Sequence, residues 1–151
     1  MPSEQRTLHA LRPEQIAAYS ECATALADLR RGLSSPDLST RGALLAQVRR
    51  YIEDHLRDPS LSPTTTAAAH GISVRTSQLV FAEAGTTASR RIRDRRLNAC
   101  YRELTRARPT DTVTDVAFRW GFTDAGHFSH AFTQSFGVTP TSVLTHARST
   151  G

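Results

Sequence analysis

The chain of 151 residues has no lysine and only two cysteines. Cys22 and Cys100 are far apart and belong to no C-x-x-C pair, so we expect neither a disulfide framework nor a cysteine metal site and interpret both as small buried residues. No apolar run approaches the roughly 18 residues needed to cross a bilayer. Residues 1–15 also lack the apolar core of a secretory signal. We therefore expect a protein of the cytoplasm that makes no membrane contact.

Patterns of catalytic and metal-binding residues are also missing. His127 and His130 are three residues apart, but no acidic residue or cysteine completes a recognisable zinc set around them. Serine, histidine and aspartate occur without a nucleophile motif. We therefore expect no enzymatic activity, no catalytic residue, no metal and no cofactor.

All 19 basic residues are arginine, and they are unevenly distributed. Residues 1–58 hold 8 arginines and 8 acidic residues, whereas residues 59–151 hold 11 arginines and 6 acidic residues, so the net charges are 0 and +5. Residues 89–108 alone contain 8 arginines and 2 acidic residues. Such a local excess favours a polyanionic partner, although a solvated helix face would also account for it.

The first part of the chain predicts two amphipathic helices. Residues 13–32 begin with Pro-Glu, which suits a first helical turn, and end at glycine. Their apolar residues recur at helical spacing: Ile16, Tyr19, Ala23 and Leu26. Residues 34–40 are rich in Ser, Pro and Asp and predict a loop. Residues 41–58 predict the second helix, which stops before Pro59.

Residues 62–85 predict a helix-turn-helix unit. Ser62 can cap a first short helix, and Pro63 suits its first position. Gly71 marks a turn, after which Ser73 can cap a second helix. Two helices joined by a tight glycine-containing turn are the helix-turn-helix plan, although helical hairpins of this length are common.

The same plan recurs in residues 112–137. Thr112 and Asp115 form a capping-box pair, Gly121 marks the turn, and Thr123 can cap the second helix. Phenylalanines at four-residue intervals then define an apolar helix face: Phe128, Phe132 and Phe136.

Residues 87–107 lie between the two units and predict a long helix. At a rise of 1.5 Å per residue, about 20 residues span roughly 30 Å. Two helix-turn-helix units can read one face of DNA if their second helices lie about 34 Å apart. The pattern therefore favours double-stranded DNA as the partner, with the arginines of this helix close to phosphates.

In order and spacing, these motifs resemble the AraC/XylS transcription regulators. The most specific stretch is VTDVAFRWGFTDAGHFSHAFTQSFGVTP, and YIEDHLRDPSLSP, HGISVRTSQ, FAEAG and IRDRRLNA match upstream of it. The resemblance covers residues 44–143, or about two-thirds of the chain. It implies an all-α fold of two helix-turn-helix units joined by a long helix. It also implies a bacterial, nucleoid-associated regulator that reads two adjacent major-groove segments of DNA.

The resemblance also implies which residues meet DNA. By position, the DNA-facing residues are Val74, Arg75, Gln78, Leu79, Ala125, Gly126, His127, Ser129 and His130. The candidates for phosphate contacts are Ser73, Arg90, Arg91, Arg95, Arg96 and Thr123. Arg75 can donate two hydrogen bonds to a guanine edge and Gln78 can pair with an adenine edge, each worth about 1–3 kcal/mol of discrimination. Exposed helix polarity without DNA contact is the alternative.

Several residues depart from the family pattern. Ser77 stands where the family usually buries a leucine, Leu79 where it often has an arginine, and Thr66 where it has an aliphatic core residue. Either Leu79 turns inward and Ser77 outward, or the first reading helix is weakened. In the second unit, His130 and its polar neighbours occupy positions where arginine and lysine are frequent, so we expect a lighter electrostatic hold on DNA.

The resemblance and the helix pattern together predict the domains. We expect residues 1–40 to form an N-terminal tail, a linker-type helix and a loop, and residues 41–148 to form the DNA-binding domain. Residues 1–40 show no β-pattern for a small-molecule sensor domain, so the chain is either a single-domain regulator or a fragment. The 13–32 helix either packs on the chain's own domain or joins a homodimer or a related regulator. The alternative function is a protein-interaction module that modulates a full-length regulator.

Overall fold

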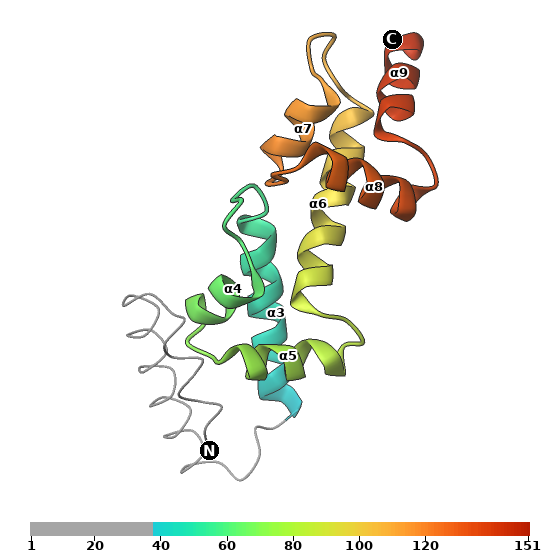
Figure 1. The fold of residues 1–151 in the computed structure, drawn as a ribbon. Coiled ribbons are helices and arrows are strands. Elements are labelled where there is room, and N and C mark those ends of the chain that lie inside the picture. The colour runs from blue at the N-terminus through green and yellow to red at the C-terminus, as the bar shows by residue number, and fades with distance from the viewer. Residues whose placement is uncertain (1–37) are drawn as a thin grey trace, which may run out of the picture. The chain divides into compact units, whose positions relative to one another are not determined.

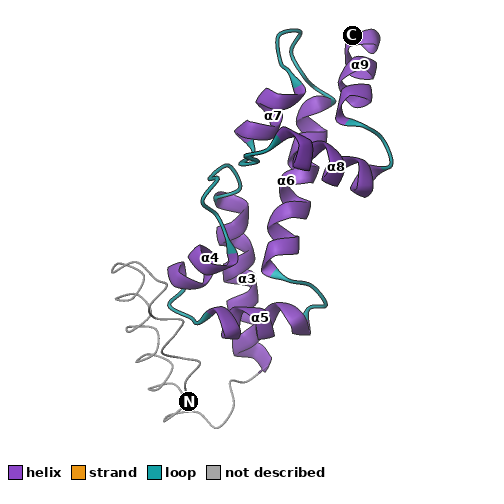
Figure 2. Ribbon diagram, in the orientation of Figure 1, coloured by secondary structure: helices purple, strands orange, loops and turns teal. Residues whose placement is uncertain are grey.

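The computed structural model describes residues 38–151, and this part of the chain consists of helices, turns and loops without a strand (Figure 1). Figure 2 shows the same helices by secondary structure. They are α3 (Leu38–Asp54), α4 (Pro63–Ala69), α5 (Val74–Glu83), α6 (Ala88–Leu104), α7 (Val113–Arg119), α8 (Ala125–Phe136) and α9 (Pro140–Thr150). The predicted all-α fold is confirmed. The predicted 13–32 helix and Cys22 lie outside the described residues.

The described residues form two compact units. The first contains residues 38–51 and 62–88, and the second contains residues 52–61 and 89–151. Each unit holds one predicted helix-turn-helix, α4 with α5 in the first and α7 with α8 in the second.

Helix α3 begins and ends earlier than the sequence predicts. The loop predicted for residues 34–40 is wrong at its end, because α3 already includes Leu38. The predicted helix end near Asp58 is wrong too, since α3 stops at Asp54. Asp58 accepts hydrogen bonds from the backbone N of Ser60 at 2.9 Å and from its Oγ at 2.7 Å, which stabilise a turn there and lower the pKa of the Asp58 carboxyl.

The first unit is built on the caps that the sequence predicts. Ser62 and Thr65 form a capping box at the start of α4, and Pro63 occupies the first helical turn. Gly71 adopts a φ of +62°, a left-handed conformation that favours glycine and turns the chain toward α5. The unit's buried apolar side chains are Val48, Ala67, Val80, Phe81 and Ala88.

The second unit has a single apolar cluster to which four helices contribute. Its buried members are Leu97, Cys100, Leu104, Val116, Ala117, Phe128, Phe132 and Leu144. The three phenylalanines predicted to form one face of α8 lie in ring contact along this cluster, with centroids 5.5 Å apart for Phe128 and Phe132 and 4.7 Å apart for Phe132 and Phe136. This packing leaves the opposite face of α8 outside the core.

Helix α9 is an element that the sequence analysis does not predict. Thr139 caps it by accepting from the Ser142 backbone N at 3.2 Å, and Pro140 lies in its first turn. Near its end, Arg148 donates to the backbone oxygens of Pro109 and Asp111 at 2.8 and 2.7 Å. The helix therefore also fastens the loop that precedes α7.

Candidate nucleic-acid interface

Helix α5 presents a polar face whose start is fixed by its cap. Ser73 Oγ accepts from the Thr76 backbone N at 3.0 Å, as the sequence predicts for a cap. Arg75, Gln78 and Leu79 are exposed, and Val74 is half-buried. The opposite face buries Ser77, Val80 and Phe81 in the first unit. The four residues predicted to face DNA therefore lie outside the core of this unit.

Two residues of α5 that depart from the family pattern are Ser77 and Leu79. Leu79 is 56% exposed, whereas Ser77 is 2% exposed, so of the two alternatives the exchange of their orientations does not occur. Ser77 Oγ is buried without a hydrogen-bond partner. Thr66 is fully buried as well, but its Oγ1 donates to the Ser62 carbonyl at 2.7 Å. Of these two polar replacements, only Ser77 leaves a buried polar atom unpaired.

Helix α8 has a different cap from the one predicted. Thr123 is exposed and precedes the N-cap, which is Asp124: its Oδ1 accepts from the His127 backbone N at 2.6 Å. Aspartate is a strong capping residue because its carboxylate also interacts favourably with the helix dipole. Of the five residues predicted to read DNA on α8, Gly126, His127 and His130 are exposed, and the other two are half-buried: Ala125 and Ser129.

The turn before α8 depends on a close approach between Gly121 and Arg96. Gly121 has a φ of +84°, and a Cβ atom there would lie 2.7 Å from Arg96 Nη2. Arg96 Nε donates to the Leu56 carbonyl at 2.9 Å, and its Nη2 donates to the Asp58 carbonyl at 2.5 Å. Arg96 is only 9% exposed, and burial lowers the pKa of its guanidinium. Because it is buried and donates from two nitrogen atoms inside the second unit, it is no longer a candidate for phosphate contact.

The other arginines predicted to contact phosphate make ion pairs with acidic side chains. Arg91 and Arg95 both pair with Glu53, at 3.2 and 2.6 Å. Arg90 pairs with Asp94 at 3.6 Å. Because these carboxylates offset part of the arginine charge, the positive potential of residues 89–108 is weaker than the number of arginines there suggests.

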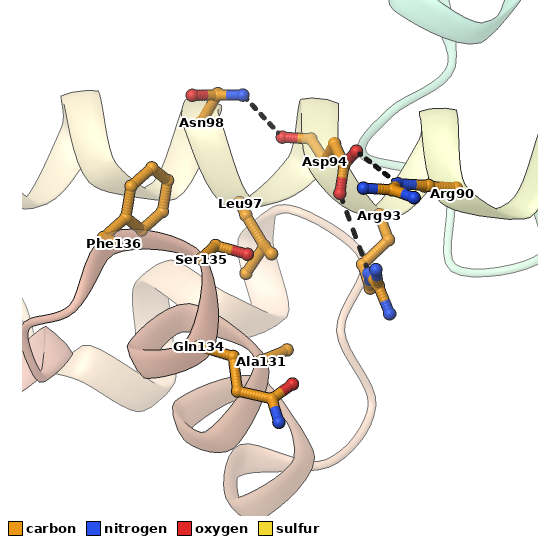
Figure 3. Close-up of a pocket in the computed structure, with 9 residues that line it drawn as sticks. All are labelled: Arg90, Arg93, Asp94, Leu97, Asn98, Ala131, Gln134, Ser135 and Phe136. Carbon is orange, nitrogen blue, oxygen red and sulfur yellow. Dashed lines mark hydrogen bonds and ion pairs between the residues drawn. The ribbon is translucent and has the colours of Figure 1, made fainter. Parts of the chain in front are cut away.

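A hollow of about 460 Å³ lies between α6 and α8 and includes a basic residue that the sequence analysis omits (Figure 3). That residue is Arg93, which lines the hollow together with Arg90 and Asp94 on α6 and Gln134 on α8. The three-residue spacing of Arg90 and Arg93 was the available signal, because it places two arginines on one side of a helix.

The described residues offer little for other chemistry. Within residues 38–151, no three His, Cys, Asp or Glu side chains lie together as a metal site. Burial raises the pKa of the Cys100 thiol to about 12, so the reactive thiolate is disfavoured. No helix of residues 38–151 combines the length and apolar character needed to cross a membrane.

The sequence is similar to regulators of bacterial transcription. A family model described as a helix-turn-helix domain, of the AraC/XylS type, matches residues 66–146. The probable thc operon regulatory protein of Rhodococcus erythropolis is 34% identical over 143 residues, covering 89% of this chain and 42% of that protein. Transcriptional activator NphR of a Rhodococcus species is 38% identical over 125 residues, covering 82% and 36%. The chain thus spans well under half the length of these two relatives.

Solved structures share the fold. The C-terminal domain of AraT, a response regulator from Geobacillus stearothermophilus, aligns with a TM-score of 0.61 and 22% identity over 67% of this chain and 83% of that one. A DNA-binding transcriptional dual regulator from Escherichia coli K-12 aligns with a TM-score of 0.60 and 18% identity, over 74% and 99%.

Proposed function

The chain belongs to the AraC/XylS-type family of helix-turn-helix transcription regulators, and we propose that it binds a specific sequence of double-stranded DNA through α5 and α8. The observation that carries this proposal is common to both units. In each, a left-handed glycine and a capped second helix leave one polar face outside the core, and the apolar face of that helix anchors it. A helix held in this way can enter the major groove.

On α5, hydrogen-bonding and apolar groups share the exposed face. Arg75 suits the guanine edge, and Gln78 suits the adenine edge. Leu79 cannot form a hydrogen bond, but its exposed side chain can contact the methyl group of thymine. We therefore assign to α5 the direct reading of bases, with an apolar contact in place of a second arginine.

On α8, the proposed reading face carries no permanent charge. Residues 125–136 contain no Arg, Lys, Asp or Glu. Small residues at Ala125, Gly126 and Ser129 allow a close approach to base edges, while His127 and His130 offer ring nitrogens for hydrogen bonds. We assign to α8 a reading role that depends on fit more than on charge.

The proposed phosphate contacts are fewer than the sequence suggests. Ser73 and Thr123 remain candidates because their hydroxyl groups stand at the starts of α5 and α8. Three arginines remain candidates despite their ion pairs: Arg90, Arg91 and Arg95. Arg96 is withdrawn.

A selection of binding sites from a random DNA pool, followed by titration at two salt concentrations, tests this proposal. We expect one recurring sequence and an affinity that falls as salt rises, because bound phosphates release counterions. Arg75→Ala should relax the selected sequence at a limited set of positions, whereas Arg102→Ala, which removes an exposed arginine from α6, should not change the sequence. Binding without sequence preference would contradict the proposal.

The alignment with this chain covers only 42% and 36% of the lengths of the two Rhodococcus relatives, so a role beyond DNA binding is inferred from the family. We propose regulation of transcription on the nucleoid, in the cytoplasm, as the role of a DNA-binding member of this family. A homodimer, or a complex with a related regulator, through residues 13–32 is the proposed partner arrangement. Binding of DNA, rather than catalysis, is the activity that the family supports.

A further inference from the structure

The hollow between α6 and α8 is a basic site beside the proposed reading helix (Figure 3). Arg90 and Arg93 project from α6 on one side of it, and Gln134 and Ser135 of α8 form the other side. The arginine side chains are 67% and 55% exposed, so both guanidinium groups are accessible to a ligand from solvent.

We propose that this α6–α8 hollow binds a backbone phosphate of the DNA strand that runs beside α8, with Arg90 and Arg93 as its cationic contacts. The inference rests on the proposed function and adds to it a phosphate site that flanks the reading helix. An α-helix is about 10–12 Å wide with its side chains, and the major groove is about 12 Å wide. A helix in that groove therefore has a phosphate strand on each flank.

The position of Gln134 links the hollow to the reading face of α8. His127, His130 and Gln134 follow each other at intervals of three and four residues, which places them along one exposed side of the helix. Gln134 also lines the hollow. The hollow therefore begins where the proposed reading face ends, as a phosphate site on the flank requires.

The charges of the hollow suit one phosphate. Arg90 Nε lies 3.6 Å from one carboxylate oxygen of Asp94, and Arg93 Nε lies 3.7 Å from the other. These separations are longer than hydrogen bonds, so Asp94 holds the two cations without a close contact at either Nε. Two cations and one anion give a net charge of +1, and one phosphate with a single negative charge would neutralise the group.

Three neighbouring arginines of α6 contact other parts of the second unit. Arg91 and Arg95 pair with Glu53, and Arg96 donates to backbone carbonyls. A second hollow of about 300 Å³ is lined by three carboxylates and one arginine, so its net charge disfavours phosphate: Glu53, Asp54, Asp58 and Arg57. Arg90 and Arg93 are the arginines that line the hollow beside α8.

Salt titrations of three variants of the full chain on a selected duplex test the proposal. Arg93→Gln should weaken binding roughly tenfold in 0.1 M salt and reduce the slope of log K against log salt by about 0.9, the value for one phosphate contact. Asp94→Asn should tighten binding, because it removes the only negative charge in the hollow. Arg102→Gln is the matched control, since it removes an exposed arginine that does not line the hollow.

A second measurement locates the phosphate. Replacing single phosphates of the duplex by neutral methylphosphonates should weaken binding of the wild-type chain at one or two adjacent positions of one strand, and Arg93→Gln should be insensitive at those positions. Equal slopes for the wild type and Arg93→Gln would overturn the inference. An equal loss in Arg102→Gln would overturn it as well. If the wild type fails to bind any duplex, the proposed function fails first; if it binds and only the Arg93 comparison fails, the proposed function stands.

Discussion

At the scale of single residues, the polar Ser77 is buried and the apolar Leu79 is exposed, which is the reverse of what their polarity favours. Ser77 is buried with an unpaired hydroxyl, and Leu79 is exposed on the proposed reading face. A buried hydroxyl without a partner costs about 1–3 kcal/mol of desolvation. The sequence analysis left two orientations open because helix periodicity alone cannot decide which of two residues at i and i+2 faces the core when their polarities conflict with their positions.

We predict that Ser77→Ala raises the free energy of unfolding by about 1 kcal/mol, because it removes the unpaired hydroxyl while nearly preserving the volume. Leu79→Ala should leave the melting temperature almost unchanged, since its side chain is exposed, but should alter the DNA sequences selected. Thermal melting without DNA and site selection with DNA measure the two effects. A large loss of stability in Leu79→Ala would mean that Leu79 packs in the core.

At the same scale, His130 lies on α8 where relatives often have arginine or lysine, so we expect weaker electrostatic attraction between α8 and DNA. We predict that His130→Arg tightens DNA binding and steepens its salt dependence, because a permanent charge is placed on the proposed reading face. His130→Gln is the control, since it keeps hydrogen-bonding capacity without adding charge. Identical salt slopes for the arginine variant and the wild type would show that position 130 does not approach the DNA backbone or a guanine.

At the scale of elements, three helix caps could be predicted from the local sequence, whereas other helix boundaries could not. Ser62, Ser73 and Thr112 act as the caps that their local sequences indicate, because a cap depends on residues within one turn. The end of α3 depends on the turn that Asp58 forms with Ser60, and the cap of α8 is Asp124 although Thr123 is also a capping type. Choosing between adjacent candidates requires the register that the packed core sets.

The proposed site was predictable to a similar extent. The positions on α5 and α8 are those that the family resemblance implies, and the structure leaves all nine predicted DNA-facing residues outside the buried core. The arginines of α6 did not follow from counting. Glu53 is close to Arg91 and Arg95, and the carbonyls of Leu56 and Asp58 are close to Arg96, only after the chain folds. Contacts over about 40 residues of sequence are not visible in local charge patterns.

Helix α7 has an acid-sensitive start. Hydrogen bonds from the side chain and the backbone of Thr112 lower the pKa of the Asp115 carboxyl in the folded chain. A carboxyl whose pKa is lower in the folded state contributes stability above its unfolded pKa of about 3.9, and that contribution is lost as the pH falls through the folded value. We predict that unfolding below about pH 4 is less pH-dependent in Asp115→Asn than in the wild type. Denaturant unfolding at pH 3 and pH 7 measures the difference, and identical pH dependence would contradict it.

At the scale of the whole molecule, residues 13–32 carry the prediction of self-association. The sequence predicts an apolar stripe here, for which the chain's own domain, a second copy or a related regulator is the expected cover. We predict that residues 1–151 sediment as a dimer and that residues 38–151, which start at α3, sediment as a monomer. If both forms sediment as monomers, the stripe does not join two copies.

The contact between Arg96 and Gly121 restricts how sequences of this kind can diverge. One guanidinium group occupies the volume where any side chain at position 121 would begin, and the same group satisfies the carbonyls of residues 56 and 58. A side chain at position 121 would meet this guanidinium group, whereas loss of Arg96 would remove its hydrogen bonds to the carbonyls of residues 56 and 58. We therefore expect relatives that retain Arg96 in this turn to retain Gly121 as well, although 25 positions separate the two residues in the chain.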